Sequence, residues 1–161
     1  MKRNNIVQIM FISIAVLFLA GVTSAQQGDE PSDNMQILRE KIHADKKLLV
    51  ATNLNLTENE AKEFWPVYDK YQKELMALND RALRNIDGYA ANADKMTDDL
   101  AKKIVKDYLA IENDRQKLRQ SYLSKFAKAL PYMKVMRYYQ IENKIQAVIN
   151  YEAAKRIPLV E

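Results

Sequence analysis

The sequence contains no cysteine, one histidine and only three glycines among its 161 residues. Without cysteine the chain cannot form a disulfide, a thiolate metal site or a cysteine nucleophile. The lone His43 cannot supply the several converging ligands that a histidine-based metal site requires. The few glycines form no phosphate-binding loop, so nucleotide binding is not expected. We therefore expect no metal, no cofactor and no catalytic residue, and we do not expect an enzyme.

Long apolar runs are also scarce, and the only one lies at the N-terminus. Lys2 and Arg3 precede the apolar run 6–22, and the small residues 23–25 follow it. This order is typical of a secretory signal peptide, and we expect cleavage after Ala25. The competing interpretation is an uncleaved membrane anchor, for which the run is at the short limit. With residues 1–25 removed, we expect an exported, periplasmic chain with no membrane span, or a secreted chain if the source has no outer membrane.

The chain carries little excess charge of either sign. Its formal net charge is +4, and the signal peptide contributes two of the positive charges through Lys2 and Arg3. The remaining excess is too small to indicate a nucleic-acid partner, and export argues against one as well.

The exported part is expected to be one helical domain. Residues 26–32 contain Gly, Pro and acidic residues and predict a flexible leader. A single helical domain should cover 33–156, followed by an extended tail over 157–161 because Pro158 restrains the residue before it. The first helix is predicted over roughly 34–52, with four leucine and isoleucine side chains directed inward: Leu38, Ile42, Leu48 and Leu49.

The stretch 54–89 predicts the second helix. Thr57 and Glu60 have the spacing of a capping box at its start, and Asp87-Gly88 should end it. Pro66 lies inside the pattern, where it either kinks the helix or starts a new one; we expect a kink, because the apolar stripe keeps its phase. The stripe recurs in steps of three and four residues: Ala61, Phe64, Tyr68, Tyr71, Leu75, Leu78, Ala82, Ile86 and Tyr89.

A third helix is predicted from a cap at Thr97 to about Ala129. Its stripe is Leu100, Ile104, Tyr108, Ile111, Leu118, Tyr122, Phe126 and Ala129. Arg115 occupies a position where an apolar residue is due, so either its stem packs while its head reaches water, or it pairs with an acid of the preceding helix. Two helices of about 30 residues joined by a short loop favour an antiparallel pairing. The predicted fold class is therefore all-α, a long antiparallel helical hairpin with flanking helices, about four helices in total.

The fourth helix, predicted over roughly 132–155, has two apolar sides. One carries Tyr138, Ile141, Ile145, Val148 and Ile149. The other carries Tyr132, Met136, Tyr139 and Ala147. The second side could contact the first helix, a second subunit or a client, or it could be buried within the monomer. Met and Tyr suit adaptable contacts, and the candidate protein-binding residues are Tyr132, Met133, Met136, Arg137 and Tyr139.

Charge is divided unevenly between the helices. Residues 98–129 and 132–156 together carry an excess of six positive charges, whereas 58–87 carry an excess of two negative charges. A basic surface with aromatic and Met side chains could attract acidic, partly unfolded chains. The same charges could pair two subunits head to tail, so a homodimer is possible.

The segment Leu56-Thr57-Glu58-Asn59-Glu60 is similar to the Leu-Thr-x-x-Gln motif at a helix start in the periplasmic Spy/CpxP family of small stress chaperones. Glu60 replaces the family's Gln, and a capping box accepts either residue. A second copy of the motif, which the family contains, is absent here. The resemblance implies an ATP-independent helical dimer, shaped like a cradle, that shields unfolded envelope proteins, or a related envelope-stress sensor.

Two functions therefore follow from the sequence. The first is a periplasmic, Spy/CpxP-like module that binds unfolded or partner envelope proteins without ATP. The alternative is a structural or regulatory interaction module that forms a fixed dimer or docks one envelope partner and has no chaperone activity.

Overall fold

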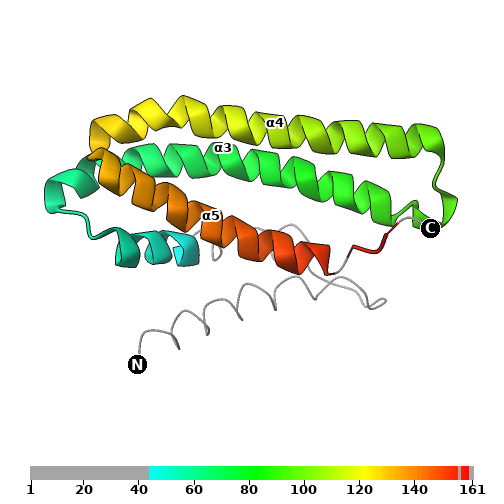
Figure 1. Cartoon of the computed structure of the whole chain (residues 1–161), viewed down its shortest axis with the longest axis horizontal. Coiled ribbons are helices and arrows are strands. Elements are labelled where there is room, and N and C mark those ends of the chain that lie inside the picture. The colour runs from blue at the N-terminus through cyan, green and yellow to red at the C-terminus, as the bar shows by residue number, and fades with distance from the viewer. Residues whose placement is uncertain (1–43, 156, 160–161) are drawn as a thin grey trace, which may run out of the picture.

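The computed structural model describes residues 44–155 and 157–159, and this part of the chain is all-α. It contains a helix over 44–54, α3 (Glu58–Ala90), a short 3-10 helix η1 (Ala93–Lys95), α4 (Asp98–Ala129) and α5 (Tyr132–Ala154). The predicted fold class is confirmed, including the long hairpin, which α3 and α4 form (Figure 1). The predicted signal peptide, the leader and His43 lie outside the described residues.

The predicted capping box is present at the start of α3. The backbone N–H of Glu60 donates to Thr57 Oγ1 at 3.3 Å, and that of Thr57 donates to Glu60 Oε2 at 2.7 Å. The helix then continues through Pro66 without a break. Its first turns lie at an angle to the remainder, as a proline kink requires (Figure 1).

The prediction that Asp87-Gly88 ends this helix is wrong by two residues, because α3 continues to Ala90. The end is instead made by the next residues: the Ala91 N–H donates to Asp87 O, and the Asn92 side chain donates to Gly88 O at 2.8 Å. These bonds satisfy carbonyls that a helix end leaves open. Gly88 is thus an ordinary helical residue.

The α3–α4 connection returns the chain at Thr97, whose side chain accepts from the Leu100 N–H at 3.3 Å. The predicted cap and the predicted end of α4 at Ala129 are both confirmed. Leu130 and Pro131 then turn the chain into α5, whose bounds agree with the prediction within one residue.

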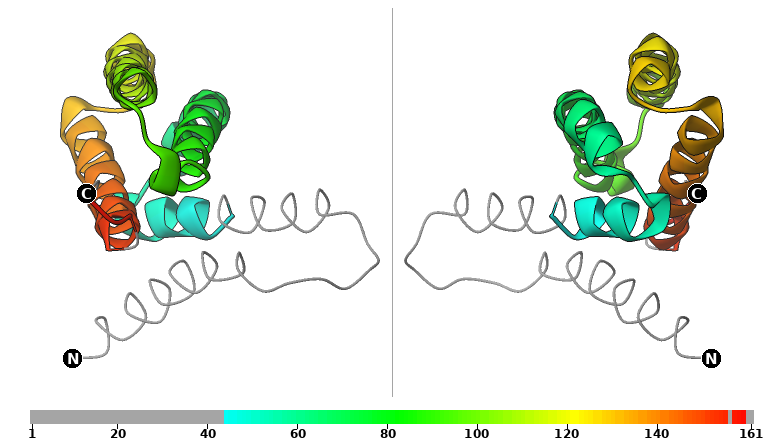
Figure 2. Two further views of the ribbon diagram at one scale, coloured as in Figure 1. Left: turned by 90° about the vertical axis from the view of Figure 1, so that its right-hand side faces the viewer. Right: turned by 90° about the vertical axis from the view of Figure 1, so that its left-hand side faces the viewer.

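Viewed end-on, α3 and α5 lie on either side of α4, and the helix over 44–54 crosses beneath them (Figure 2). Residues 157–159 lie outside any helix, and the Tyr89 hydroxyl donates to Pro158 O at 2.8 Å. This bond places the described part of the tail beside the end of α3.

The core is aromatic and lies toward one end of the hairpin, where the four α-helices of the described residues meet. Phe126 is central, with its ring centroid 5.7 Å from that of Phe64 and 4.7 Å from that of Tyr138. Rings at such distances and tilts attract one another beyond their burial alone. The fully buried side chains of the core come from all four helices: Val50, Leu54, Phe64, Tyr68, Tyr71, Tyr122, Phe126, Val135 and Tyr138.

The predicted stripes are buried near this end and only half-buried toward the far end. On α3 the stripe is buried from Phe64 to Leu75 and half-buried from Leu78 to Tyr89. On α4 the prediction for Tyr108 is wrong, since 56% of this residue is exposed. At 3.6 residues per turn Tyr108 is rotated by about 60° from the buried Ile111, so it lies at the flank of the stripe.

The first helix also differs from its prediction. It continues to 54 rather than 52, and Leu54 and Val50 are buried together with Leu49. Leu48 was expected inward but is 58% exposed, because the buried positions 50 and 54 define a face that turns residue 48 outward. Leu38 and Ile42 lie outside the described residues.

A buried polar network attaches this helix to the bundle. Lys46 Nζ lies 2.8 Å from Glu142 Oε2 and donates to Gln72 Oε1 at 2.9 Å. Gln72 Nε2 donates to Glu142 Oε1 at 2.9 Å and to the Tyr138 hydroxyl at 3.3 Å. Burial, followed by the nearby Glu142 charge, raises the pKa of Tyr138 far above its usual range, so this hydroxyl stays protonated. The network connects three helices through groups that would be costly to bury singly.

Candidate binding surface at the start of α5

The start of α5 is shaped by the turn that precedes it. The Leu130 N–H closes α4 by donating to Phe126 O, and Leu130 itself is buried. The Pro131 carbonyl then accepts from the N–H groups of Lys134 and Val135. Because Val135 and Tyr138 are buried in the core, the first turn of α5 must direct its other side chains outward.

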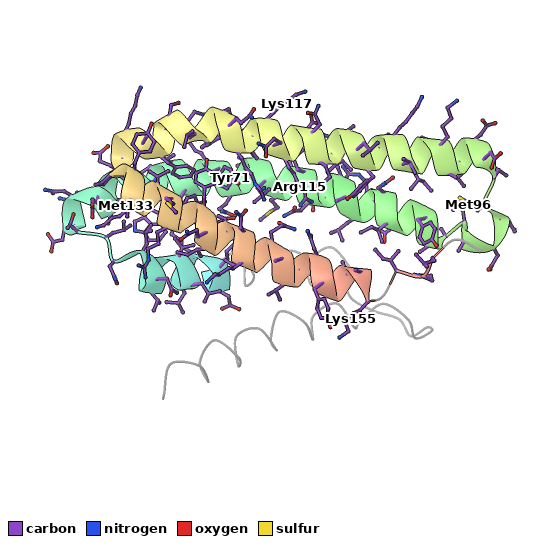
Figure 3. The ribbon with its side chains drawn as sticks, in the orientation of Figure 1. Tyr71, Met96, Arg115, Lys117, Met133 and Lys155 are labelled. Atoms are coloured by element: carbon purple, nitrogen blue, oxygen red, sulfur yellow. The ribbon has the colours of Figure 1, made fainter. Side chains whose placement is uncertain are left out.

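Three large side chains are exposed there. Tyr132 is 69% exposed, Met133 is 78% exposed and Met136 is 57% exposed. Met136 lies one helical turn beyond the other two, so the three occupy neighbouring positions. We call Tyr132, Met133 and Met136 the α5 surface; Figure 3 marks Met133 at this end of the molecule.

Hydrogen bonds from Lys134 connect the start of α5, which carries the α5 surface, to residues at the start of α3. Lys134 Nζ donates to Glu60 Oε2 at 2.5 Å and to Asn55 O at 2.9 Å. The Lys134 hydrogen bond, together with the Thr57 backbone bond, lowers the pKa of Glu60. The capping residues predicted from the sequence thus also contact α5. These hydrogen bonds hold the backbone that carries Tyr132, Met133 and Met136.

Arg137, the fourth predicted contact residue, is exposed, but its guanidinium is already in use. Arg137 Nε donates to Asn53 O at 2.6 Å, which joins α5 to the end of the helix over 44–54. This bond uses one of the five N–H groups of the guanidinium, so four others are left for a partner. The structure therefore places Arg137 beside the α5 surface, with one bond committed to the fold.

Tyr139, the fifth predicted residue, does not belong to the α5 surface. It is half-buried, its hydroxyl donates to Arg119 O at 2.8 Å, and its ring centroid lies 6.1 Å from that of Phe126. Tyr139 therefore packs between α5 and α4. The side of α5 that carries Tyr132, Met136 and Tyr139 is therefore only partly covered. Tyr132 and Met136 in the first turns of α5 are exposed, whereas Tyr139 is covered by α4.

Exposed apolar side chains also occur outside the α5 surface, and one group of them lies far from this end. On α4, Val105, Tyr108 and Leu109 are all more than half exposed. The sequence pattern placed Tyr108 in the inward stripe and did not single out Val105 or Leu109, although these two share the spacing of one helical turn. They form a second apolar area on the half of the hairpin that α5 does not cover (Figure 1).

The described residues contain no group of three or more His, Asp or Glu side chains that could hold a metal ion. Within the same ranges no helix is both long enough and apolar enough to cross a membrane. Comparison of the chain with protein-family models, with curated proteins and with solved structures gives no match. The binding surface is therefore inferred only from the exposure and contacts of the α5 residues.

Proposed function

We propose that this protein is an exported, periplasmic module that binds unfolded or partner envelope proteins without ATP. The observation that carries the proposal is the exposure of Tyr132, Met133 and Met136 on a fixed helix start. Flexible Met side chains can adapt to unrelated apolar sequences, and a Tyr ring adds apolar area with a polar tip. The similarity of 56–60 to the Spy/CpxP motif supports the same proposal, and no catalytic step is assigned.

Charge around the α5 surface favours an acidic client. Lys125 and Lys128 near the end of α4 are exposed, as is Arg137. Lys125 Nζ lies 3.8 Å from the Tyr122 ring centroid, which holds that cation near the core end of the bundle. Such charges speed the approach of acidic chains and weaken with salt.

Aggregation assays test this proposal. The protein, at a several-fold molar excess and without ATP, should suppress aggregation of a chemically reduced, unfolded client. The double substitution Met133→Ser and Met136→Ser should remove most of the suppression, since it deletes two of the three exposed side chains. The matched control is Val105→Ser with Leu109→Ser, which removes as many exposed apolar side chains from the far half of α4.

Equal loss in both double variants would contradict the proposed location, and no suppression by the unsubstituted protein would contradict chaperone activity. The apolar area of Val105, Tyr108 and Leu109 favours the alternative of a fixed dimer or a single docked partner. That alternative predicts a stoichiometric complex in light scattering, loss of that complex on Val105→Ser with Leu109→Ser, and no protection of unrelated clients.

A further inference from the structure

A polar groove of about 310 Å³ lies between α4 and α5, away from the α5 surface. Its lining includes Glu112, Arg115 and Arg119 from α4 and Asn143, Gln146 and Asn150 from α5. The aromatic core does not extend between the two helices at this level, so amide and guanidinium groups face each other instead. The volume is at the small end of the range for ligand sites.

Arg115 is the unusual member of this lining. Only 11% of its side chain is exposed, and its Nε is buried without a hydrogen-bond partner among the described residues. The nearest anion is Glu112 Oε1 on the same helix, 3.5 Å away in an ion pair that makes no hydrogen bond. A buried donor without an acceptor is unfavourable, so this N–H favours an acceptor brought by a ligand.

Neither sequence-based interpretation of Arg115 describes this position fully. The stem packs as expected, but the head is mostly covered, and Figure 3 marks it on the side of α4 that faces the other helices. The ion pair to the preceding helix is made by its neighbour, since Arg81 Nη1 lies 2.7 Å from Asp114 Oδ2. The Arg115 guanidinium thus remains available to the groove.

Arg119 lies one helical turn further along the same lining. Its backbone oxygen accepts the Tyr139 hydroxyl at 2.8 Å, and its side chain hydrogen-bonds Tyr71, where its charge opposes the rise in pKa that burial causes. The Tyr71 contact engages the Arg119 side chain and leaves further N–H donors in its fork. Two guanidinium groups at i and i+4 therefore line one side of the groove.

The α5 side of the groove adds donors without adding negative charge. Asn143, Gln146 and Asn150 are neutral amides, and Gln146 Nε2 donates to Asn150 Oδ1 at 2.8 Å. Among the described residues that line the groove, Glu112 is the single carboxylate, so with Arg115 and Arg119 these residues carry a net charge of +1. By contrast, in the groove between α3 and α4 the Asp114 carboxylate lies within ion-pair distance of Arg81 and of Lys117, at 2.7 and 3.8 Å.

We propose that the α4–α5 groove binds a carboxylate group through Arg115 and Arg119. A planar guanidinium matches a carboxylate with two parallel hydrogen bonds, and one negative charge balances the net charge of the lining. The carboxylate can come from a small free acid or from an acidic side chain of a polypeptide. This site goes beyond the proposed function, because it does not use the α5 surface.

Arginine Nε–Hε resonances in NMR spectra of the ¹⁵N-labelled protein test the site directly. Acetate supplies the free carboxylate, and a short neutral-ended peptide with one Glu supplies the polypeptide source, with its Gln analogue as control. We expect a saturable shift of the Arg115 resonance with acetate, the Glu peptide or both, with a dissociation constant of roughly 1 mM. Whichever source saturates identifies the origin of the carboxylate.

Two variants distinguish binding in the groove from a nonspecific attraction of the carboxylate to positive charge. Arg115→Lys keeps the charge and removes the fork, so binding followed at the Arg119 resonance should weaken about tenfold. Lys106→Met removes an exposed charge from the same helix and should leave binding unchanged. Circular dichroism checks that both variants are folded.

The proposal is overturned if the shifts are linear, if chloride at equal ionic strength reproduces them, or if the Gln peptide binds as well as the Glu peptide. Saturation by inorganic phosphate but by neither carboxylate would overturn it equally. Because the readout is binding at Arg115, failure here leaves the aggregation result untouched.

Discussion

At the scale of single residues, the charged side chains of the bundle differ in how deeply they are buried. Lys46 and Glu142 are largely buried, with side-chain exposures of 14% and 6%, and they satisfy each other through Gln72. Lys47, the next residue, pairs with Asp69 at the surface, with side-chain exposures of 37% and 47%. Two adjacent lysines with ion pairs of similar length therefore differ mainly in burial.

Substituting each lysine in turn should show how much the burial of an ion pair, at equal length, contributes to the free energy of unfolding. Lys46→Met leaves Glu142 charged and buried without its cation, and we expect a loss of about 3 kcal/mol in the free energy of unfolding. Lys47→Met removes an exposed ion pair and a cation near the Trp65 ring, and we expect a loss below about 1 kcal/mol. Urea unfolding followed by circular dichroism measures both; equal losses would show that the buried network is not what attaches the first helix.

At the scale of elements, the hairpin is unevenly supported. One half of α3 and α4 is packed against α5 and the helix over 44–54 around the aromatic core. In the other half, the inward side chains of both helices, from Leu78 to Tyr89 and from Leu100 to Ile104, are only half-buried. Local stability follows the burial of apolar contacts, so the two halves should open independently.

Hydrogen exchange should reveal this difference along each helix. We expect slow amide exchange in α3 between 64 and 75 and in α4 between 115 and 129, and faster exchange toward the η1 connection, although all these amides are helical. Peptide-resolved exchange followed by mass spectrometry makes the measurement. Uniform protection along both helices would contradict a core confined to one end.

How far the sequence predicted these elements depends on what each pattern encodes. Steps of three and four residues located the helices, and the side chains of Thr57 and Thr97 located two starts, because both signals are local. The end of α3 was missed, since Asn92 and Ala91 close it through bonds that depend on the loop conformation. The exposure of Leu48 and Tyr108 was also missed, because it depends on which neighbouring helix covers each face.

At the scale of the whole molecule, the sequence left open whether the second apolar side of α5 is covered. The structure covers Tyr139 with α4 and leaves Tyr132, Met133 and Met136 exposed. The angle at which α5 leaves α4 decides this division, and no sequence repeat encodes that angle. The same divergence opens the arginine-lined groove, which the sequence indicated only through the out-of-pattern Arg115.

Methionine methyl groups offer the most direct test of the binding surface, because they report from both ends of the molecule. Met133 and Met136 lie at the start of α5, Met96 lies at the opposite end beside η1 (Figure 3), and Met76 is half-buried in α3. On addition of an unfolded polypeptide without ATP to ¹³C-methyl-labelled protein, we predict that the Met133 and Met136 signals shift or broaden while those of Met76 and Met96 stay unchanged. Changes of equal size at Met96, or no change at Met133 and Met136 under saturating polypeptide, would contradict the proposed surface.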